Sequence, residues 1–368
     1  MTQNLSDNGA PAGARTGNRP KEARIAWLDS LRGLAILMVI AHHAILAMDA
    51  LIPTGQIPGY FAHLNAVLYW MMLPTFFLSF GIFFSPQQGW SSVFRKRLTL
   101  YVWLIVVWTS LQFASELAGV HLYPWSGSPI LSFRSLGGTP YGVLWFLYSL
   151  ALCTLVLQAL SSVRPIWQLT GVIGLYALIY LLLWGTGAQM HDLPFWVWQT
   201  IELGLPFALI GYWGKPALAW ITDTTGRATL FCVLFYAVCV LLLVVGANDL
   251  DGLLKSLVCY IPATLGLVAF ARLIPVRLSE RLGLGWFGRH SLEIFLTHEF
   301  FIAIYSPRLF DPAIMQHLAA PLIWLAVVVL TAISSFGATV VLKRQFGGVL
   351  FASPWLPSRR KLMPRLSE

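Results

Sequence analysis

The stretch that decides the fold is LDSLRGLAILMVIAHHAILAMD, residues 28–49. It opens with charged side chains, and from Gly33 to Met48 it is apolar apart from two histidines. A helix of about twenty apolar residues is long enough to cross the hydrocarbon core of a bilayer. The apolar run is too long for a signal peptide, and no small-residue cleavage pattern follows it. The stretch therefore predicts a first transmembrane helix.

The composition of the whole chain agrees with this prediction. Of the 368 residues, 57% are hydrophobic and 11% are charged, whereas about a quarter of the residues of an ordinary soluble domain are charged. The mean hydropathy of +0.71 implies more apolar surface than one soluble core can bury. Four cysteines lie inside apolar runs without metal-type spacing, and we interpret them as small buried hydrophobic residues. They are Cys153, Cys232, Cys239 and Cys259.

Ten apolar runs of helix-spanning length follow one another along the chain, with polar or Pro/Gly-containing links between them. They cover about residues 30–49, 62–84, 97–119, 141–160, 166–184, 195–213, 228–246, 254–271, 289–306 and 318–342. The runs are continuous and not alternating, which argues against the strands of a membrane β-barrel. The sequence thus predicts an all-α, polytopic membrane bundle of about ten transmembrane helices.

The positions of the basic residues indicate the orientation of this bundle. If the N-terminus is inside, 21 of the 24 Lys and Arg residues fall on the cytoplasmic side, and only Arg134, Lys255 and Arg308 fall outside. Cytoplasmic loops of membrane proteins carry such an excess of positive charge. We therefore expect both termini in the cytoplasm and a multi-pass protein of the inner membrane. The basic pI of about 9.6 then belongs to a membrane face, and no nucleic acid partner is expected.

This arrangement divides the chain into three parts. Residues 1–24 are polar and rich in Gly, Pro and Ala, which predicts a disordered cytoplasmic tail. Residues 25–342 form the ten-helix membrane domain, and residues 343–368 form a basic cytoplasmic tail. Neither tail is long enough or apolar enough to be a separate enzyme, so any chemistry belongs to the bundle.

The ionisable residues of the first predicted helix are candidates for function. An ionisable group inside a bilayer costs several kcal/mol unless it is paired or hydrated. Arg32 lies near the inner end of the helix, and His43 lies about 16 Å further along, near the middle of the membrane. A neutral histidine at that depth can accept a proton. Arg32 could instead pair with Asp29, three residues earlier, as a structural contact.

The ninth predicted helix repeats this arrangement. His298 follows Arg289 by about 13 Å, at a depth similar to that of His43. Both helices run from inside to outside, so the two histidines could face each other across the bundle. These residues could instead have purely structural roles. Both arginines would then fix the orientation of their helices in the membrane, and each histidine, His42 included, would make an ordinary interhelical hydrogen bond.

Four segments, taken together and in order, carry a resemblance to a known family. They are LDSLRGLAILMVIAHHA (28–44), PTFFLSFGIFF (74–84) with FRKR (94–97), LWFLYSL (144–150) and FGRHSLEIFLTH (287–298). They resemble the Arg-and-His opening motif, the FF-LSG helix with its basic cluster, the LWFL segment and the late G–S–IYL–H motif of membrane acyltransferase family 3. The resemblance spans about residues 25–342. Two departures stand out: Phe80 separates Ser79 from Gly81, and Leu100 occupies the place of a second arginine three residues after Arg97.

The resemblance implies transfer of an acyl group, most commonly acetyl, from cytoplasmic acyl-coenzyme A to a hydroxyl of a carbohydrate. The acceptor would be an exopolysaccharide, a lipopolysaccharide or a periplasmic glucan. The implied catalytic residues are His43, Arg32 and His298. The donor phosphates would meet Arg32, Arg289 and the cluster Arg95, Lys96 and Arg97. Neither a metal nor a tightly bound cofactor is expected. His43 could deprotonate the hydroxyl or carry the acyl group itself, and the sequence leaves both routes open.

A secondary transporter or flippase is the alternative from another class. Ten helices and intramembrane histidines fit that function too. Against it, the sequence contains no inverted repeat and no pair of interrupted helices at matching positions. Transfer from acyl-coenzyme A separates the two hypotheses, since a transporter would show none.

Overall fold

A computed structural model describes residues 26–53, 56–86, 89–119, 142–187, 193–244, 256–312 and 319–354. The predicted tail 1–24, residues 355–368 of the predicted C-terminal tail, and two of the three predicted outer basic residues, Arg134 and Lys255, lie outside these ranges. All candidate site residues lie within them.

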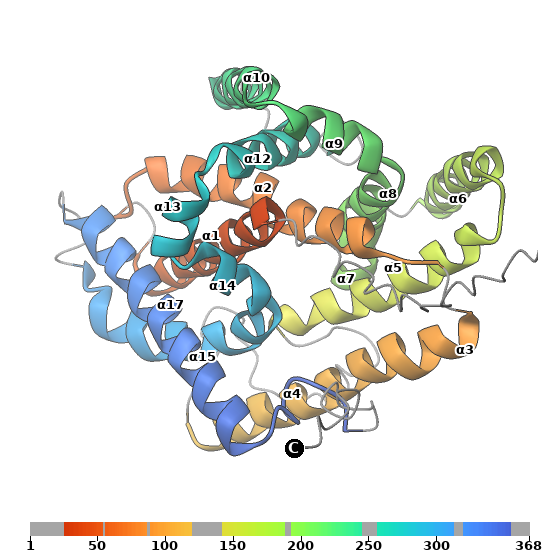
Figure 1. Ribbon diagram of the computed structural model, residues 1–368. Helices are drawn as coiled ribbons and strands as arrows, with labels where there is room; N and C mark the ends of the chain where they lie inside the picture. The colour runs from red at the N-terminus through yellow and green to blue at the C-terminus, as the bar shows by residue number, and fades with distance from the viewer. Residues whose placement is uncertain are drawn as a thin grey trace, which may run out of the picture.

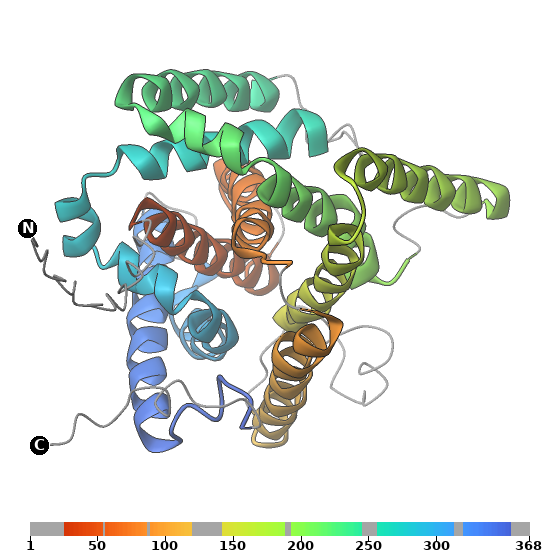
Figure 2. The same ribbon diagram turned by 45° about the vertical axis from the view of Figure 1, so that its right-hand side comes forward.

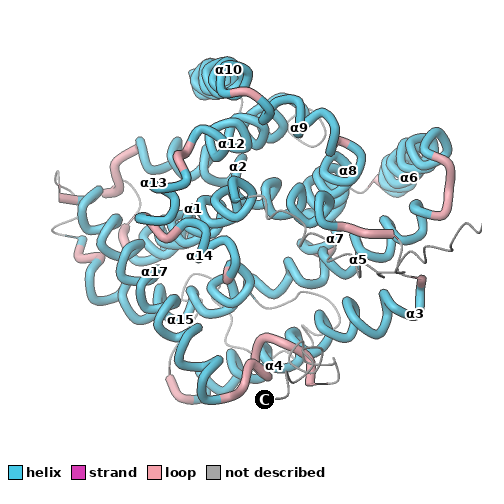
Figure 3. The backbone as a smooth tube through the Cα atoms, viewed as in Figure 1, coloured by secondary structure: helices cyan, strands magenta, loops and turns pink. Residues whose placement is uncertain are grey.

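The described part of the chain is built of helices and contains no strand (Figure 3). The α-helices, labelled as in Figure 1, are α1 Ala26–Leu51, α2 Tyr60–Phe83, α3 Trp90–Ser92, α4 Thr99–Leu117, α5 Trp145–Ser161, α6 Pro165–Thr186, α7 Phe195–Gln199, α8 Leu205–Trp213, α9 Lys215–Asp223, α10 Thr225–Val244, α12 Ile261–Leu273, α13 Val276–Arg281, α14 Leu284–Arg289, α15 Ser291–Leu309 and α17 Ala320–Gln345. Short π- or 3₁₀-helical pieces are η1 Val93–Leu98, η4 Gly142–Leu144, η6 Thr200–Gly204 and η8 Ser256–Tyr260.

Seven helical stretches within the described ranges are long and apolar enough to cross a membrane. They are Trp27–Leu51, Tyr60–Phe83, Trp90–Leu117, Gly142–Ser161, Ile166–Thr186, Thr225–Leu242 and Ala320–Gln345. The other three expected runs are helical as well. They correspond to the composite α7–η6–α8, to η8–α12 with its apolar part Val258–Leu273, and to α15. The all-α class is therefore confirmed, and the count of ten transmembrane helices stays a prediction.

The third predicted helix begins earlier than expected. A start at residue 97 was predicted, but the helix runs without interruption from Trp90 through α3, η1 and α4 to Leu117. The basic cluster Arg95–Arg97 therefore lies inside the helix and not at its start. Arg and Lys are good helix formers, and their long stems reach polar surroundings, so they need not end a membrane helix.

Helix α1 is the centre of the bundle (Figures 1 and 2). It packs against α2, α12, α14, α15 and α17. Leu31, Ala35, Ile36, Val39 and Ile40 are all fully buried. A helix that is apolar on every side is one that other helices surround, so α1 fixes where the remaining helices can stand.

Two glycines let α1 and the short helix α14 touch through their backbones. A Cβ atom on Gly33 would collide with the backbone oxygen of Leu284, and one on Gly288 would collide with that of Asp29. Small residues allow this close approach in membrane helices. The same device joins α2 to α8, where Gly81 faces Ala208 and Gly211 faces Leu78. The first contact fixes the inner end of α1, where Arg32 lies.

Helix α2 continues through Pro74. Proline has no N–H, so the carbonyl of Trp70, one turn earlier, loses its helical partner. The hydroxyl of Thr264 in α12 donates a long hydrogen bond of 3.5 Å to this carbonyl. A neighbouring helix thereby satisfies the polar group that the proline frees, as the absence of water in a bilayer requires.

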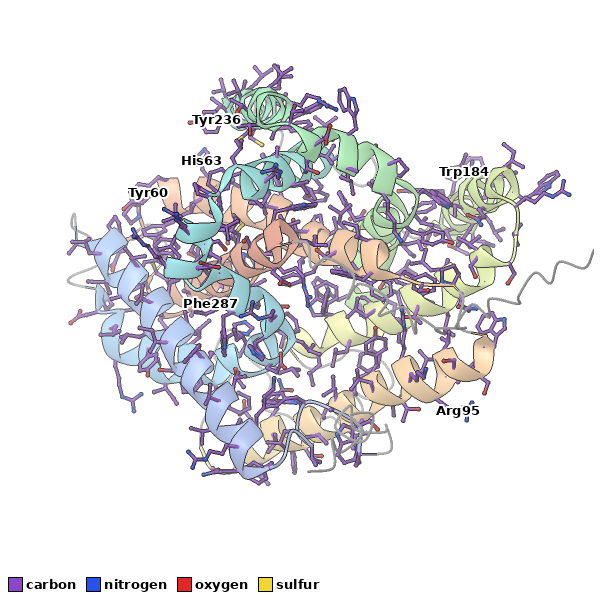
Figure 4. All side chains as sticks on the ribbon, viewed as in Figure 1. Tyr60, His63, Arg95, Trp184, Tyr236 and Phe287 are labelled. Carbon is purple, nitrogen blue, oxygen red and sulfur yellow. The ribbon has the colours of Figure 1, made fainter. Side chains whose placement is uncertain are left out.

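Helices α6 and α10 lie at the periphery in both ribbon views (Figures 1 and 2). Trp184 on α6 and Tyr236 on α10 point outward (Figure 4) and are 83% and 71% exposed. Large exposed apolar side chains on long helices are suited to contact with lipid. The bundle therefore has a lipid-facing rim around the buried α1.

The segment after α17 folds back onto α4 (Figure 1). The indole N–H of Trp103 donates to the carbonyl of Val349 at 2.8 Å, and that of Trp108 donates to the carbonyl of Leu350 at 2.9 Å. The ring of Phe351 packs on Trp108 and is buried. Residues 349–351, in the first part of the predicted basic tail, thus connect the end of α17 to α4. We call this set of contacts the tie.

We expect Gly288→Ala to destabilise the protein by about 1–3 kcal/mol, because the added methyl group forces the backbones of α1 and α14 apart. Gly174→Ala on α6 is the matched control, since a Cβ there meets nothing within 4 Å. It should leave the stability unchanged or raise it slightly. The thermal midpoint of the detergent-solubilised protein measures both. Equal midpoints for the two variants would show that the close contact is dispensable.

Candidate active site

Helices α1 and α15 bring His43 and His298 into contact. Nε2 of His298 lies 3.4 Å from Nδ1 of His43, and the ring centroids are 5.0 Å apart at a steep angle. His298 is fully buried, and 16% of the His43 side chain is exposed. Two histidines 255 residues apart in the chain thus form one cluster inside the bundle.

Local hydrogen bonds assign the proton on each ring. Nδ1 of His43 lies 2.9 Å from the carbonyl oxygen of Val39, and Nδ1 of His298 lies 2.8 Å from that of Phe295. A carbonyl oxygen only accepts, so each neutral ring carries its proton on Nδ1 and donates it to its own helix. Nε2 of His43 then keeps its lone pair. This nitrogen is the atom of the cluster that is ready to accept a proton or an acyl group.

The carboxylate of Glu299 faces that nitrogen. Its Oε1 lies 3.8 Å from Nε2 of His43, and the side chain is 2% exposed. This separation is too long for a direct hydrogen bond. A hydroxyl oxygen at about 2.8 Å from each atom would fit between them. Sequence reasoning missed Glu299 as a site residue, although an ionisable residue at this depth in a membrane helix is a signal for function.

Arg32 lies about three helical turns from His43 on α1. Its Nη2 donates to the hydroxyl of Ser291, the first residue of α15, at 2.9 Å. Together with Arg97 of η1, Arg32 lines a cavity of about 420 Å³. The guanidinium of Arg97 lies over the rings of Phe84 and Phe80, at 4.7 and 5.9 Å from their centroids. The cavity therefore contains two cations from helices that are distant in sequence.

The rest of the cavity wall is mostly apolar. It is formed by Phe76, Phe80, Phe83, Leu100, Phe146, Leu150, Leu292 and Phe295, with hydroxyls from Ser79, Tyr101 and Ser291. Phe295 also touches His298, with ring centroids 5.8 Å apart, and packs on Phe146 at 5.1 Å. A pair of aromatic rings thus lies between this cavity and the His43–His298–Glu299 cluster.

The structure brings only part of the predicted basic set together. Arg95 and Lys96 are exposed on η1 and do not line the cavity, and Arg95 donates to the carbonyl of Ser91. Figure 4 labels Arg95 on this helix. Arg289 lines a separate cavity of about 250 Å³ together with Asp29 and Arg272. Arg32 and Arg97 are therefore the predicted cations that share a cavity.

The ring of His42 packs edge-on against that of His43, with centroids 5.2 Å apart, but its hydrogen bond is made with another helix. Nδ1 of His42 lies 2.6 Å from Oδ1 of Asn65 in α2. Consecutive helical residues point about 100° apart, so His42 and His43 reach different helices. His42 therefore makes an ordinary interhelical hydrogen bond, which is the structural role considered above for the histidines.

His43, His298 and Glu299 are also of the residue types that bind metal ions. One ligand atom from each lies within 4.8 Å of the others. Two histidines and one carboxylate are a donor set for a transition metal such as zinc. The expectation that no metal is needed stays a prediction, and elemental analysis of the purified protein tests it.

A family model described as an acyltransferase domain matches residues 25–340. The chain belongs to acyltransferase family 3. This family consists of membrane-bound acyltransferases, so the protein is an enzyme that transfers acyl groups. A transporter without acyl-transfer chemistry is thereby set aside. No curated protein and no solved structure matches the chain.

The matched region of this family 3 acyltransferase runs from α1 almost to the end of α17. It contains the histidine cluster and the cavity of Arg32. The two departures from the family motifs, Phe80 and Leu100, both line that cavity. They make its wall more apolar, and Phe80 also carries the guanidinium of Arg97 on its ring.

We expect Glu299→Gln to lower the rate of acyl transfer about 100- to 10,000-fold, because a neutral amide cannot stabilise a positive charge that forms on His43. The measurement is the turnover rate of the purified variant, with size-exclusion chromatography as the check of folding. Glu116→Gln on α4 is the matched control, and it should keep the full rate. A fully active Glu299→Gln enzyme would assign the carboxylate to packing alone.

Proposed function

We propose that the protein transfers an acyl group, acetyl in the simplest case, from cytoplasmic acyl-coenzyme A to a hydroxyl of a cell-envelope or exported carbohydrate. His43 is the catalytic residue, either as a general base or as a carrier of the acyl group. The observation that supports this proposal is the position of Nε2 of His43, which lies 3.8 Å from Oε1 of Glu299 inside an acyltransferase bundle.

The donor fits the cavity of Arg32 and Arg97. Coenzyme A carries several phosphate charges, and guanidinium groups bind phosphates through paired hydrogen bonds. Between the phosphates and the thioester lies the pantetheine arm, a long and mostly apolar chain. The aromatic and aliphatic wall of the cavity suits such a chain. Arg32 and His43 are separated by about 16 Å along α1, and the rings of Phe146 and Phe295 lie between the cavity and the histidines. For the thioester to reach His43, these rings must move aside.

In the direct route, His43 acts as a general base. The acceptor oxygen attacks the thioester carbon while Nε2 of His43 takes the hydroxyl proton. The carbon–sulfur bond then breaks, and the leaving thiolate receives that proton. The products are an ester and the thiol of coenzyme A, and His43 returns to its neutral form. Glu299 stabilises the imidazolium in between. In the second route, Nε2 attacks the thioester carbon, the carbon–sulfur bond breaks and the thiolate of coenzyme A leaves. The acceptor hydroxyl then attacks the acyl carbon, the bond to Nε2 breaks, and the hydroxyl proton neutralises the thiolate, which gives the same ester and thiol.

The acceptor and the membrane follow from the family resemblance and the charge pattern. The resemblance favours a carbohydrate hydroxyl on an exopolysaccharide, a lipopolysaccharide or a periplasmic glucan. The excess of Lys and Arg on one side of the predicted spans favours ten transmembrane helices in the inner membrane with both termini in the cytoplasm. The donor cavity then opens toward the cytoplasm, where acyl-coenzyme A is available.

We expect His43→Gln to abolish acyl transfer while insertion and folding stay near normal. Glutamine keeps the size and part of the hydrogen bonding of histidine, but it cannot act as a base or carry an acyl group. Two measurements check this: release of free thiol from acetyl-coenzyme A by the purified protein, and mass spectrometry of the envelope carbohydrates of cells with and without it. The loss of a general base costs about 100- to 10,000-fold in rate.

His42→Ala is the control for this experiment. It removes the neighbouring imidazole and its contact with Asn65, at a cost of about 1 kcal/mol in stability, and should keep most of the activity. Full activity of His43→Gln would refute the role of His43. Envelope carbohydrates that are identical with and without the protein would refute the acceptor.

For the orientation, we expect a cysteine at Pro58 to react with a membrane-impermeant thiol reagent added to intact cells. A cysteine at Asp223, the last residue of α9 in the segment that follows the sixth predicted span, should stay unlabelled. Both are introduced into a variant that lacks the four native cysteines. Asp223 pairs with Arg227 at the surface, and the loss of such an exposed pair matters little. Labelling of residue 223 from outside would contradict the ten-helix topology.

A further inference from the structure

The cavity of Arg32 and Arg97 contains a hydroxyl without a partner. Ser79 of α2 lines the cavity and is 2% exposed. Among the described residues, no atom makes a hydrogen bond to its Oγ. A buried hydroxyl without a partner is unfavourable, because it has lost its hydrogen bonds to water and gained none in return. A serine in a membrane helix usually avoids this cost by donating to the carbonyl four residues earlier, and Ser79 does not.

The other hydroxyls of the cavity wall already have partners, and the two arginines are cations that suit phosphates. Arg32 donates to Ser291, and Arg97 lies over two phenylalanine rings. The hydroxyl of Tyr101 interacts with the side chain of Thr154. Ser79 is thus the hydroxyl of this wall that has no hydrogen-bond partner among the described residues.

The surroundings of Ser79 indicate what that molecule presents to it. Its neighbours in the wall, Phe76 and Phe80, are aromatic, and Leu100 and Leu150 are aliphatic. Such a wall suits an uncharged chain of methylene groups, whereas phosphates require cations. A single hydroxyl between apolar side chains suits one neutral polar group, for which it can both donate and accept a hydrogen bond.

We propose that Ser79 binds an amide group of the pantetheine arm of the acyl donor and so fixes the position of the arm between Arg32 and the histidines. This inference rests on the proposed donor, acyl-coenzyme A. The amide is a neutral donor and acceptor within an otherwise apolar arm, and it supplies the partner that Ser79 lacks. Ser79 acts in binding and takes no part in proton transfer.

The test is the dissociation constant of coenzyme A for the purified protein in lipid nanodiscs, together with the thermal midpoint without ligand. Ser79→Ala should weaken binding about 3- to 10-fold, the worth of one neutral hydrogen bond. The same change should leave the ligand-free midpoint equal or slightly higher, because it removes an unsatisfied hydroxyl. A purely structural serine would not give these two opposite effects. Ser79→Cys, which keeps the size but donates weakly, should also weaken binding.

Ser335→Ala on α17 is the matched control. Ser335 is also fully buried with no hydrogen-bond partner among the described residues, but it does not line the cavity. This variant should bind coenzyme A like the unaltered protein. The salt dependence of binding distinguishes a contact with the arm from a contact with the phosphates. The loss of affinity in Ser79→Ala should be the same at low and high ionic strength, since screening acts on charges. The loss in Arg32→Ala should shrink at high salt.

Each other outcome overturns a specific part of the argument. If the unaltered protein binds coenzyme A and Ser79→Ala binds it equally well, the role of Ser79 is refuted and the proposed function stands. A loss that disappears at high salt assigns Ser79 to the phosphates and refutes the arm contact. If the unaltered protein does not bind coenzyme A, the proposed donor falls, and the inference falls with it.

Discussion

The packing of α15 against α1 is the interaction on which the site depends. Among the described residues, polar contacts cross this interface at two levels: Arg32 to Ser291 near the inner end, and His43 to His298 and Glu299 in the middle. The two levels are eleven residues apart on α1 and, measured to His298, seven apart on α15. This difference of four residues, about 6 Å of helix, is taken up by the long side chain of Arg32. In a bilayer no water replaces a lost partner, so the two helices are held in one register.

That register in turn depends on backbone contact at the inner end. Gly33 and Gly288 allow α14 to lie directly on α1, and α15 begins two residues after α14 ends. The glycines therefore fix the start of α15, and the start of α15 fixes the depth of His298 and Glu299. Gly288 and His298 stand ten residues apart in the segment that resembles the late family motif, and the structure gives this spacing a physical reason.

Much of this could be predicted from the sequence, because lipid imposes strong rules on it. Continuous apolar runs predicted the helices, and rare ionisable residues pointed to Arg32, His43 and His298. Glu299 was missed since adjacent helical positions usually face different neighbours, and only the packing of α15 on α1 shows that its carboxylate reaches His43. Whether Arg97 or Arg289 lines the same cavity as Arg32 depends on contacts between helices far apart in the chain. No pattern within a single helix contains that information. The early start of the third helix had a local cause, the high helix propensity of its basic cluster.

The tie between the segment after α17 and α4 has a consequence for how the enzyme is made. Helix α4 continues from η1 and supplies Leu100 and Tyr101 to the cavity of Arg32 and Arg97. The carbonyl that accepts from Trp103 belongs to a residue 246 positions later in the chain. At the usual pace of translation, about 5–20 residues per second, α4 waits roughly 10 to 50 s in the membrane before this partner is synthesised. One wall of the cavity is therefore secured only late in biogenesis, after the helices that carry both histidines have been made.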